Sequence, residues 1–271
     1  MADPYFIYGT AWKTSATKTL VKLAIEKGFR AIDTANQPKH YTEDLVGEAL
    51  AELRHEGYIQ REDLFLQTKF TPVSGQDARI PYDPDTSIKT QVLTSFQSSL
   101  THLQTDYLDA YLLHGPYGHL GLTEDDWSVW ETLEQIHLSG KAKKIGVSNF
   151  NTQQLAELTQ HANIKPMILQ NRCFARTGWD KEVREFCHSH AILYEGFSLL
   201  TANPAVMDSH SVMDLAKKYD KTPAQIIFRF AMHIGITPLT GTSNPKHMQE
   251  DLAVNDFELL ADEIALLENL R

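Results

Sequence analysis

Three ionisable side chains stand at the ends of successive apolar segments. Asp33, Lys69 and His114 each close a short, largely apolar run. Taken singly, each has a structural reading: a cap for Asp33, a surface group for Lys69, a packed core side chain for His114. Buried strands seldom carry charge, however, so three such ends in succession favour a site. Neighbouring strands lie about 5 Å apart, so the pattern predicts a cluster of carboxylate, ammonium and imidazole.

Such a cluster suits proton transfer by a fourth group. Tyr41, which lies beyond Asp33 near the start of the next helical segment, is the available phenol. A buried Lys69 beside Asp33 would stay charged, and a cation next to a phenol lowers the pKa of the phenol. Tyr41 could then protonate an alkoxide while a hydride arrives from the other side. His114 could orient the carbonyl oxygen.

Eight short apolar segments alternate with amphipathic helical segments along the chain. The candidate strands are 5–8, 31–33, 64–69, 109–114, 144–147, 167–170, 192–195 and 236–239. Strands separated by helices pair in parallel, because a crossover helix returns the chain in the same direction. Eight units in 271 residues predict one α/β domain, residues 1–271, folded as a (β/α)8 TIM barrel. Active sites of that fold lie at the carboxyl ends of the strands.

The composition argues against several classes of function. The chain has 25 Lys and Arg against 35 Asp and Glu, a net charge of −10. A nucleic-acid-binding function is therefore not expected, because it requires a positively charged surface. No window approaches about 18 uninterrupted apolar residues and no leader pattern opens the chain, so a cytoplasmic protein without a membrane span is expected. Cys173 and Cys187 form no Cys-x-x-Cys pair, so zinc is not expected. No Gly-x-Gly-x-x-Gly follows a strand, so a Rossmann cofactor site is not expected either.

Five ordered motifs span nearly the whole chain. They are GFRAIDTA at 28–35, EDLVGEAL at 43–50, SLTHL at 99–103, DYLDAYLLH at 106–114 and GVSNF at 146–150. Together they resemble the motifs of the aldo-keto reductase family. The resemblance implies reduction of small aldehydes or ketones to alcohols with NADPH, or alternatively NADH, by a monomer that needs no metal. It implies a catalytic tetrad of Asp33, Tyr41, Lys69 and His114.

The resemblance also assigns cofactor and substrate contacts. Ser148, Asn149 and Gln170 would hold the nicotinamide carboxamide. Phe197, where the family usually has Tyr, would stack on the nicotinamide ring. The other residues expected at the cofactor are Gly9, Thr10, Ala11, Asp33, Ser198, Leu200, Thr240, Gly241, Thr242, Ser243, His247, Glu250 and Asp251. Those expected to line the substrate pocket are Trp12, Phe70, His114 and Tyr117.

One departure from the family pattern concerns the proton donor. Tyr41 lies three residues further from Asp33 than the family motif places its tyrosine, so the loop between them must bulge. Counting backward from Val46-Gly47 would put His40 at that position instead. Tyr41 is the expected donor because only a phenol has the right chemistry, and His40 is the alternative.

Other departures concern the cofactor and the pocket. Gly241-Thr242 stands where the family has Lys-Ser, and His247 replaces an Arg that grips the 2′-phosphate of NADPH. Imidazole is mostly neutral at pH 7 and lacks the bidentate fork of Arg, so NADH use stays open. Gly115 replaces a Trp, and the chain ends at Arg271 without the long C-terminal loop of many relatives. Both features predict a wide, permissive pocket.

Two other functions fit parts of the pattern. A regulatory subunit could bind the cofactor without turnover, but it would need no proton donor, so the intact tetrad favours an enzyme. A metal-dependent hydrolase on the same fold would explain His188-Ser189-His190, which resembles a pair of metal ligands. That triplet precedes a strand, on the barrel face opposite the expected site, so a solvated helix end is favoured.

Overall fold

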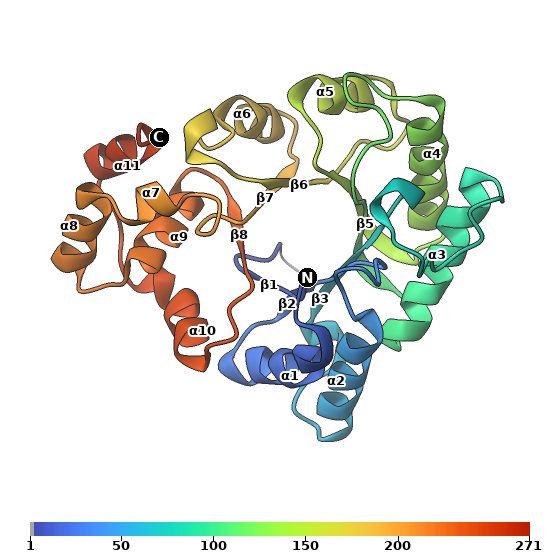
Figure 1. The fold of residues 1–271 in the computed structure, drawn as a ribbon, viewed down its shortest axis with the longest axis horizontal. Helices are drawn as coiled ribbons and strands as arrows, with labels where there is room; N and C mark the ends of the chain where they lie inside the picture. The colour runs from blue at the N-terminus through green and yellow to red at the C-terminus, as the bar shows by residue number, and fades with distance from the viewer. Residues whose placement is uncertain (1–2) are drawn as a thin grey trace.

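The computed structural model describes residues 3–271, and its centre is a closed barrel of eight parallel strands (Figure 1). Each strand pairs with the next one in the chain, and β8 pairs with β1. The strands are β1 (Ile7–Gly9), β2 (Ala31–Asp33), β3 (Phe65–Phe70), β4 (Leu108–Leu113), β5 (Ala142–Ser148), β6 (Ile168–Arg172), β7 (Leu193–Phe197) and β8 (Thr237–Thr240). The closed parallel order confirms the expected (β/α)8 TIM barrel.

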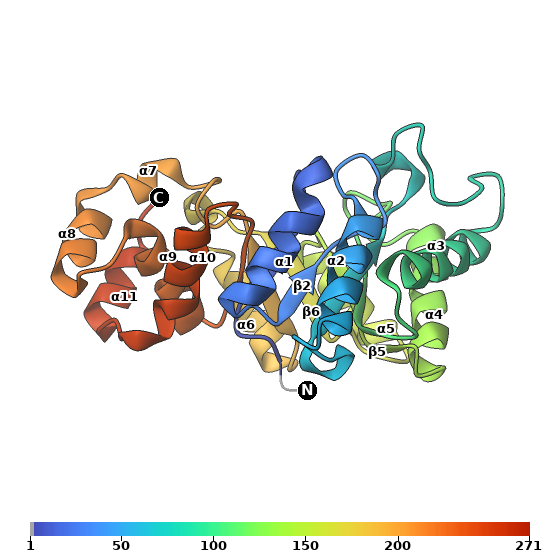
Figure 2. The ribbon, with the colours of Figure 1, turned by 90° about the horizontal axis from the view of Figure 1, so that it is seen from below.

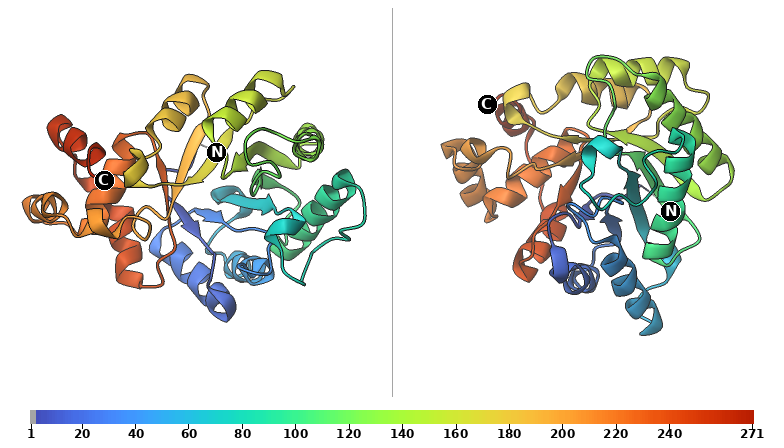
Figure 3. Two further views of the ribbon diagram at one scale, coloured as in Figure 1. Left: turned by 45° about the horizontal axis from the view of Figure 1, so that its top comes forward. Right: turned by 45° about the vertical axis from the view of Figure 1, so that its right-hand side comes forward.

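Helices surround the strands in all views (Figure 1, Figure 3). They are α1 (Thr17–Lys27), α2 (Glu43–His55), α3 (Ile88–Leu103), α4 (Glu124–Leu138), α5 (Thr152–His161), α6 (Lys181–Ser189), α7 (Pro204–Met207), α8 (His210–Tyr219), α9 (Pro223–His233), α10 (Pro245–Leu252) and α11 (Ala261–Glu268). Figure 2 shows α7 to α11 gathered on one side of the molecule, away from α3 and α4. Within residues 3–271, every helix is too short or too polar to cross a membrane.

The predicted strands all form, and their ends differ from the prediction by at most two residues. These small shifts matter at the rim of the barrel. β3 continues through Phe70, so Lys69 lies within the strand and not at its last position. β4 ends at Leu113, so His114 opens the loop that follows. The three predicted strand ends therefore stand at the carboxyl rim of three neighbouring strands.

The start of α2, directly after Tyr41, is anchored to the barrel by Glu43. The buried carboxylate of Glu43 accepts a hydrogen bond from Thr68 Oγ1 on β3 at 2.5 Å and lies 3.1 Å from His102 Nδ1 on α3. The hydrogen bond to Glu43 raises the pKa of His102. Gly47 lets α2 lie close to the end of α3, since an added Cβ would stand 1.8 Å from the His102 carbonyl oxygen. These contacts hold the segment that carries Tyr41.

Candidate active site

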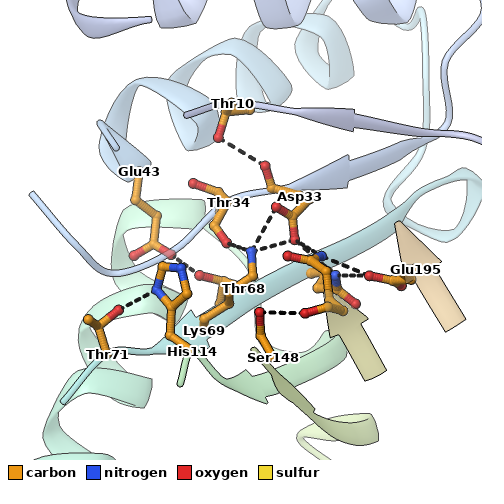
Figure 4. A network of polar contacts seen from close by, with 12 residues as sticks. Thr10, Asp33, Thr34, Glu43, Thr68, Lys69, Thr71, His114, Ser148 and Glu195 are labelled. Carbon is orange, nitrogen blue, oxygen red and sulfur yellow. Dashed lines mark hydrogen bonds and ion pairs between the residues drawn. The ribbon is translucent and has the colours of Figure 1, made fainter. Parts of the chain in front are cut away.

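A buried ion pair joins β2 and β3 at the rim of the barrel (Figure 4). Lys69 Nζ lies 2.6 Å from Oδ1 and 2.7 Å from Oδ2 of Asp33, and it donates to the Thr34 carbonyl at 2.9 Å. Thr10 donates to the Asp33 carbonyl through both its backbone N–H and its hydroxyl, which holds the end of β2. The donors of the ammonium are thus all used by Asp33 and Thr34.

Tyr41 stands over this ion pair and lines a cleft at the barrel mouth. Its ring centroid lies 5.6 Å from Lys69 Nζ and 5.9 Å from the centroid of the His114 ring. Burial first, and then the charge of Asp33, raise the pKa of the phenol. The net shift is thus opposite to the lowering expected from Lys69, whose hydrogen bonds go to Asp33 and the Thr34 carbonyl. Tyr41 therefore keeps its proton at neutral pH.

His40, the alternative to Tyr41, packs elsewhere. Its ring lies against Trp12, with 3.8 Å between the ring centroids, and its Nδ1 is buried without a partner in the part of the chain described. The backbone N–H of Trp12 donates to the His40 carbonyl at 2.7 Å. Trp12 lines the cleft and His40 does not. The structure thus packs the ring of Tyr41 near Lys69 and His114, whereas the ring of His40 packs on Trp12.

His114 is a half-buried, neutral imidazole at the cleft. Its Nδ1 lies 2.7 Å from Thr71 Oγ1, and its carbonyl accepts a hydrogen bond from Asn149 Nδ2 at 2.8 Å. Burial first, and then the charges of Lys69 and His40, hold the pKa of His114 well below its usual range. When the Thr71 hydroxyl donates to Nδ1, the ring proton resides on Nε2. His114 can then donate one hydrogen bond without carrying a charge.

Gln170 on β6 connects the ion pair to the cofactor side of the site. Its Nε2 donates to Asp33 Oδ1 at 3.0 Å and to Glu195 Oε2 at 2.8 Å. Ser148 Oγ donates to the Gln170 carbonyl at 2.7 Å. Both N–H bonds of the Gln170 amide are therefore used, while its Oε1 accepts no hydrogen bond within residues 3–271. A free acceptor that lines the cleft suits the amide group of a nicotinamide.

The cleft has a volume of about 940 Å³ and extends from Tyr41 and His114 to α10. The predicted cofactor residues that line it are Gly9, Ala11, Asp33, Ser148, Gln170, Phe197, Ser198, Leu200, Thr240, Gly241, Thr242, Ser243, His247, Glu250 and Asp251. Its parts fit a dinucleotide. Phe197 on β7 supplies an aromatic face in the cleft, and the N-terminus of α10 lies beside it, where backbone N–H groups favour a phosphate.

The sequence profile described as the aldo/keto reductase family matches residues 8–204 and 205–271. The chain belongs to the aldo/keto reductase family. It is 36% identical over 256 residues to the uncharacterized oxidoreductase YtbE of Bacillus subtilis (strain 168), covering 93% of this chain and 84% of that protein. It is 32% identical over 251 residues to glyoxal reductase of the same organism, covering 92% and 82%. The Bombyx mori aldo-keto reductase crystallised in complex with NADP aligns with a TM-score of 0.83 and 28% identity, covering 99% and 91%.

This reductase is therefore an oxidoreductase of a family that acts on small carbonyl compounds with NAD(P)H. Five of its predicted site residues lie outside the cleft, among them Lys69, which is fully buried beneath it. Phe70 is fully buried and packs against Tyr82, with 5.5 Å between the ring centroids, so it does not line the pocket. Tyr117 packs against the same core, and its hydroxyl is buried. Thr10 and Asn149 support tetrad residues from outside the cleft. The Thr10 side chain donates to the Asp33 carbonyl, and the Asn149 side chain donates to the His114 carbonyl.

Two cations of the reductase line the cleft and were not among the predicted site residues. Lys13 Nζ donates to the Gly241 carbonyl at 2.6 Å, and burial lowers the pKa of Lys13 to about 8. Arg172 ends β6, with its guanidinium 5.6 Å from the centroid of the Phe197 ring. Arg172 is the last residue of β6, so the rule that selected strand-end residues would have found it once the end of the strand was known. Lys13 lies in the loop after β1, beyond the reach of that rule.

The metal-site alternative gains no support from the geometry. Among residues 3–271, no group of three or more His, Cys, Asp or Glu side chains is placed to hold a metal ion. His188 and His190 lie at the end of α6, before β7, and thus away from the carboxyl rim. Cys173 and Cys187 are buried free thiols.

Proposed function

We propose that this reductase converts small aldehydes or ketones to alcohols with NADPH, with NADH as the alternative cofactor. When bound, the nicotinamide supplies a hydride to the carbonyl carbon, and the chain supplies the proton and holds the oxygen. The observation that carries the proposal is the place of the Tyr41 phenol at the cleft. Its ring centroid lies 5.6 Å from Lys69 Nζ and 5.9 Å from the centroid of the His114 ring. A protonated acid beside a fixed cation and a neutral donor suits this chemistry.

Tyr41 is the proposed general acid. Its raised pKa keeps the phenol protonated in the resting protein, so a proton is available when negative charge develops on the substrate oxygen. The proton then passes from the phenol to that oxygen, and a phenolate remains. Lys69 stabilises the phenolate by its charge, and Asp33 holds the ammonium in place through two hydrogen bonds.

His114 is the proposed donor that orients the carbonyl oxygen. Its low pKa keeps the ring neutral, so it can offer an N–H without competing with Tyr41 as the acid. Thr71 on one side and the Asn149 side chain on the other hold the residue at the rim. A fixed donor aimed at the developing negative charge is worth more than a mobile one, because it costs no reorganisation during the reaction.

The cofactor would lie along the cleft from Gln170 to α10. Gln170 Oε1 would accept from the carboxamide and Phe197 would stack on the ring, while the Lys13 ammonium suits the pyrophosphate. Near α10 the cleft presents the hydroxyls of Thr242 and Ser243 and the imidazole of His247 in place of Lys or Arg. NADPH is preferred because the similar Bombyx mori enzyme was crystallised with NADP.

The proposal is tested by following NAD(P)H absorbance with purified protein and a panel of aldehydes, ketoses, quinones and diketones. Glyoxal belongs in the panel because a similar protein is a glyoxal reductase. We expect oxidation of NADPH with at least one carbonyl, and much slower oxidation by the Tyr41→Phe variant. Tight binding of NADPH without oxidation by any carbonyl would instead support a regulatory subunit.

A further inference from the structure

Two carboxyl groups face each other inside the barrel, joined by two side-chain amides. Gln67 Nε2 donates to Asp33 Oδ1 at 2.9 Å and to Glu195 Oε2 at 2.7 Å. Gln170 Nε2 makes the same pair of bonds, at 3.0 and 2.8 Å. Glu195 lies on β7, fully buried, and Figure 4 shows it across the barrel from Asp33. Glu195 takes no part in the proposed proton transfer.

Two atoms of this network are left without a partner. Glu195 Oε1 and Gln67 Oε1 are both buried and make no hydrogen bond within the described residues. Both are acceptors when Glu195 is ionised, so they cannot satisfy each other. A carboxylic acid and a primary amide pair through two hydrogen bonds, N–H to C=O and O–H to C=O. The first bond of such a pair is present between Gln67 Nε2 and Glu195 Oε2, and one proton on Glu195 Oε1 would supply the second.

We propose that Glu195 is a positioning residue that acts as a neutral carboxylic acid and fixes the orientation of the amides of Gln67 and Gln170. This inference rests on the proposed function, since its purpose is to prepare the cofactor site and the tetrad. Glu195 accepts one N–H of Gln170 and Asp33 accepts the other, so Gln170 Oε1 must point away from both carboxyl groups. The amide cannot flip without bringing Oε1 against a carboxyl oxygen.

The charges around Glu195 support the neutral form. The groups that face it are Asp33 on β2, Gln67 and Lys69 on β3, and Gln170 on β6. Lys69 already gives its donors to Asp33 and the Thr34 carbonyl. An ionised Glu195 would place a second negative charge beside Asp33 with no cation of its own. Burial first, and then the charge of Asp33, raise the pKa of Glu195 to about 7.

The first test compares two substitutions at one position. Glu195→Gln keeps the shape and offers Gln67 an N–H donor, as the neutral acid does, whereas Glu195→Ala removes both contacts. We expect Glu195→Ala to weaken cofactor binding about tenfold, the equivalent of one lost hydrogen bond, and to lower kcat. Glu195→Gln should rescue both. Equal losses in the two variants would overturn the proposal, because an ionised carboxylate would then be required.

The second test uses pH. Glu195 is neutral below about pH 7 and ionises above it. The dissociation constant of NADH, measured by fluorescence, should therefore rise with pH through 7 in the wild type relative to Glu195→Gln. Glu134→Gln is the matched control: Glu134 is a buried carboxylate on α4 that accepts from the Ile164 N–H at 2.8 Å. The proposal would be contradicted if the ratio of the NADH dissociation constants of the wild type and Glu195→Gln stayed constant with pH.

The third test needs neither cofactor nor turnover. Infrared difference spectra between the wild type and Glu195→Gln should show the carbonyl stretch of one protonated carboxyl group below pH 7. The native state binds this proton more tightly than the unfolded chain does. The free energy of unfolding should thus fall from pH 4.5 toward 7 relative to Glu195→Gln. Absence of the band would sink the proposal, whereas a wild type without turnover but with the band would sink only the reductase assignment.

Discussion

Lys69 Nζ lies 2.6 and 2.7 Å from the two carboxylate oxygens of Asp33, and both side chains are buried. Removing one partner of a buried pair leaves an uncompensated charge, which costs far more than the pair contributes. Asp33→Asn is therefore expected to lower the free energy of unfolding by about 3–5 kcal/mol. Urea unfolding followed by circular dichroism measures this change.

The double variant Asp33→Asn/Lys69→Met is the control for that prediction. It removes both charges, so it should be more stable than Asp33→Asn alone, although it should lack activity. A single variant as stable as the wild type would show that the ammonium does not depend on Asp33 in the way that the geometry indicates.

Tyr41→Phe tests the proton donor. The substitution removes only the hydroxyl, so kcat should fall by about 100- to 10,000-fold, the range of a general acid. The dissociation constant of NADPH, measured by fluorescence titration, should stay unchanged. His40→Ala is the matched control at the neighbouring residue, and it should keep most of its activity because His40 packs on Trp12 outside the cleft. The reverse outcome, an active Tyr41→Phe and an inactive His40→Ala, would transfer the role to His40.

The arrangement of Asp33, Lys69 and His114 could be predicted from the sequence because their strands are neighbours in both chain and space. In a parallel barrel, successive strand ends meet at one rim. The pKa of Tyr41 could not be predicted in this way. It depends on how deeply the loop after β2 buries the phenol and on how close that loop brings it to Asp33.

Phe70 and Glu195 show what could and what could not be predicted from the sequence. Phe70 follows Lys69 in one strand, and successive side chains of a strand point to opposite faces, so the inward Lys69 already excluded Phe70 from the barrel mouth. Glu195 illustrates the other limit. Its partner Gln67 lies 128 residues away, and only the closed barrel brings the two side chains together.

Lys13 predicts a pH dependence of cofactor binding. Burial lowers its pKa to about 8, so the cofactor-free protein carries this charge below pH 8 and loses it above. The dissociation constant of either cofactor should therefore rise as the pH passes 8. Lys13→Arg should remove that dependence because a guanidinium stays charged. Fluorescence titration below and above pH 8 measures the effect. A dependence that persists in Lys13→Arg would assign it to another group.

His247 predicts how cofactor preference can be changed. It lines the cleft near the N-terminus of α10, where an Arg would offer a bidentate fork to a 2′-phosphate. His247→Arg is expected to tighten binding of NADPH about tenfold, as one charge-assisted hydrogen bond would. Binding of NADH, which lacks that phosphate, should not change, and His247→Gln should leave both cofactors nearly unaffected. If binding of the two cofactors tightened equally, His247 would lie near a part of the cofactor other than the 2′-phosphate.

Gly47 links helix packing to the position of Tyr41. A methyl group at this position would stand 1.8 Å from the His102 carbonyl oxygen, so α2 and α3 would have to separate. That separation would also strain the contact between His102 and Glu43, and Glu43 begins α2 just after Tyr41. Gly47→Ala should therefore lower the free energy of unfolding by about 1–3 kcal/mol and reduce kcat as well.

Gly115→Ala is the matched control for Gly47→Ala, since nothing lies within 4 Å of an added Cβ there. Thermal unfolding of both variants, with kcat measured on the same preparations, separates the two sites. We expect a lower Tm only for Gly47→Ala, because its methyl group meets backbone atoms that cannot rotate away. An unchanged Tm would mean that α2 and α3 do not approach so closely, and the anchoring of Tyr41 through α2 would then need another source.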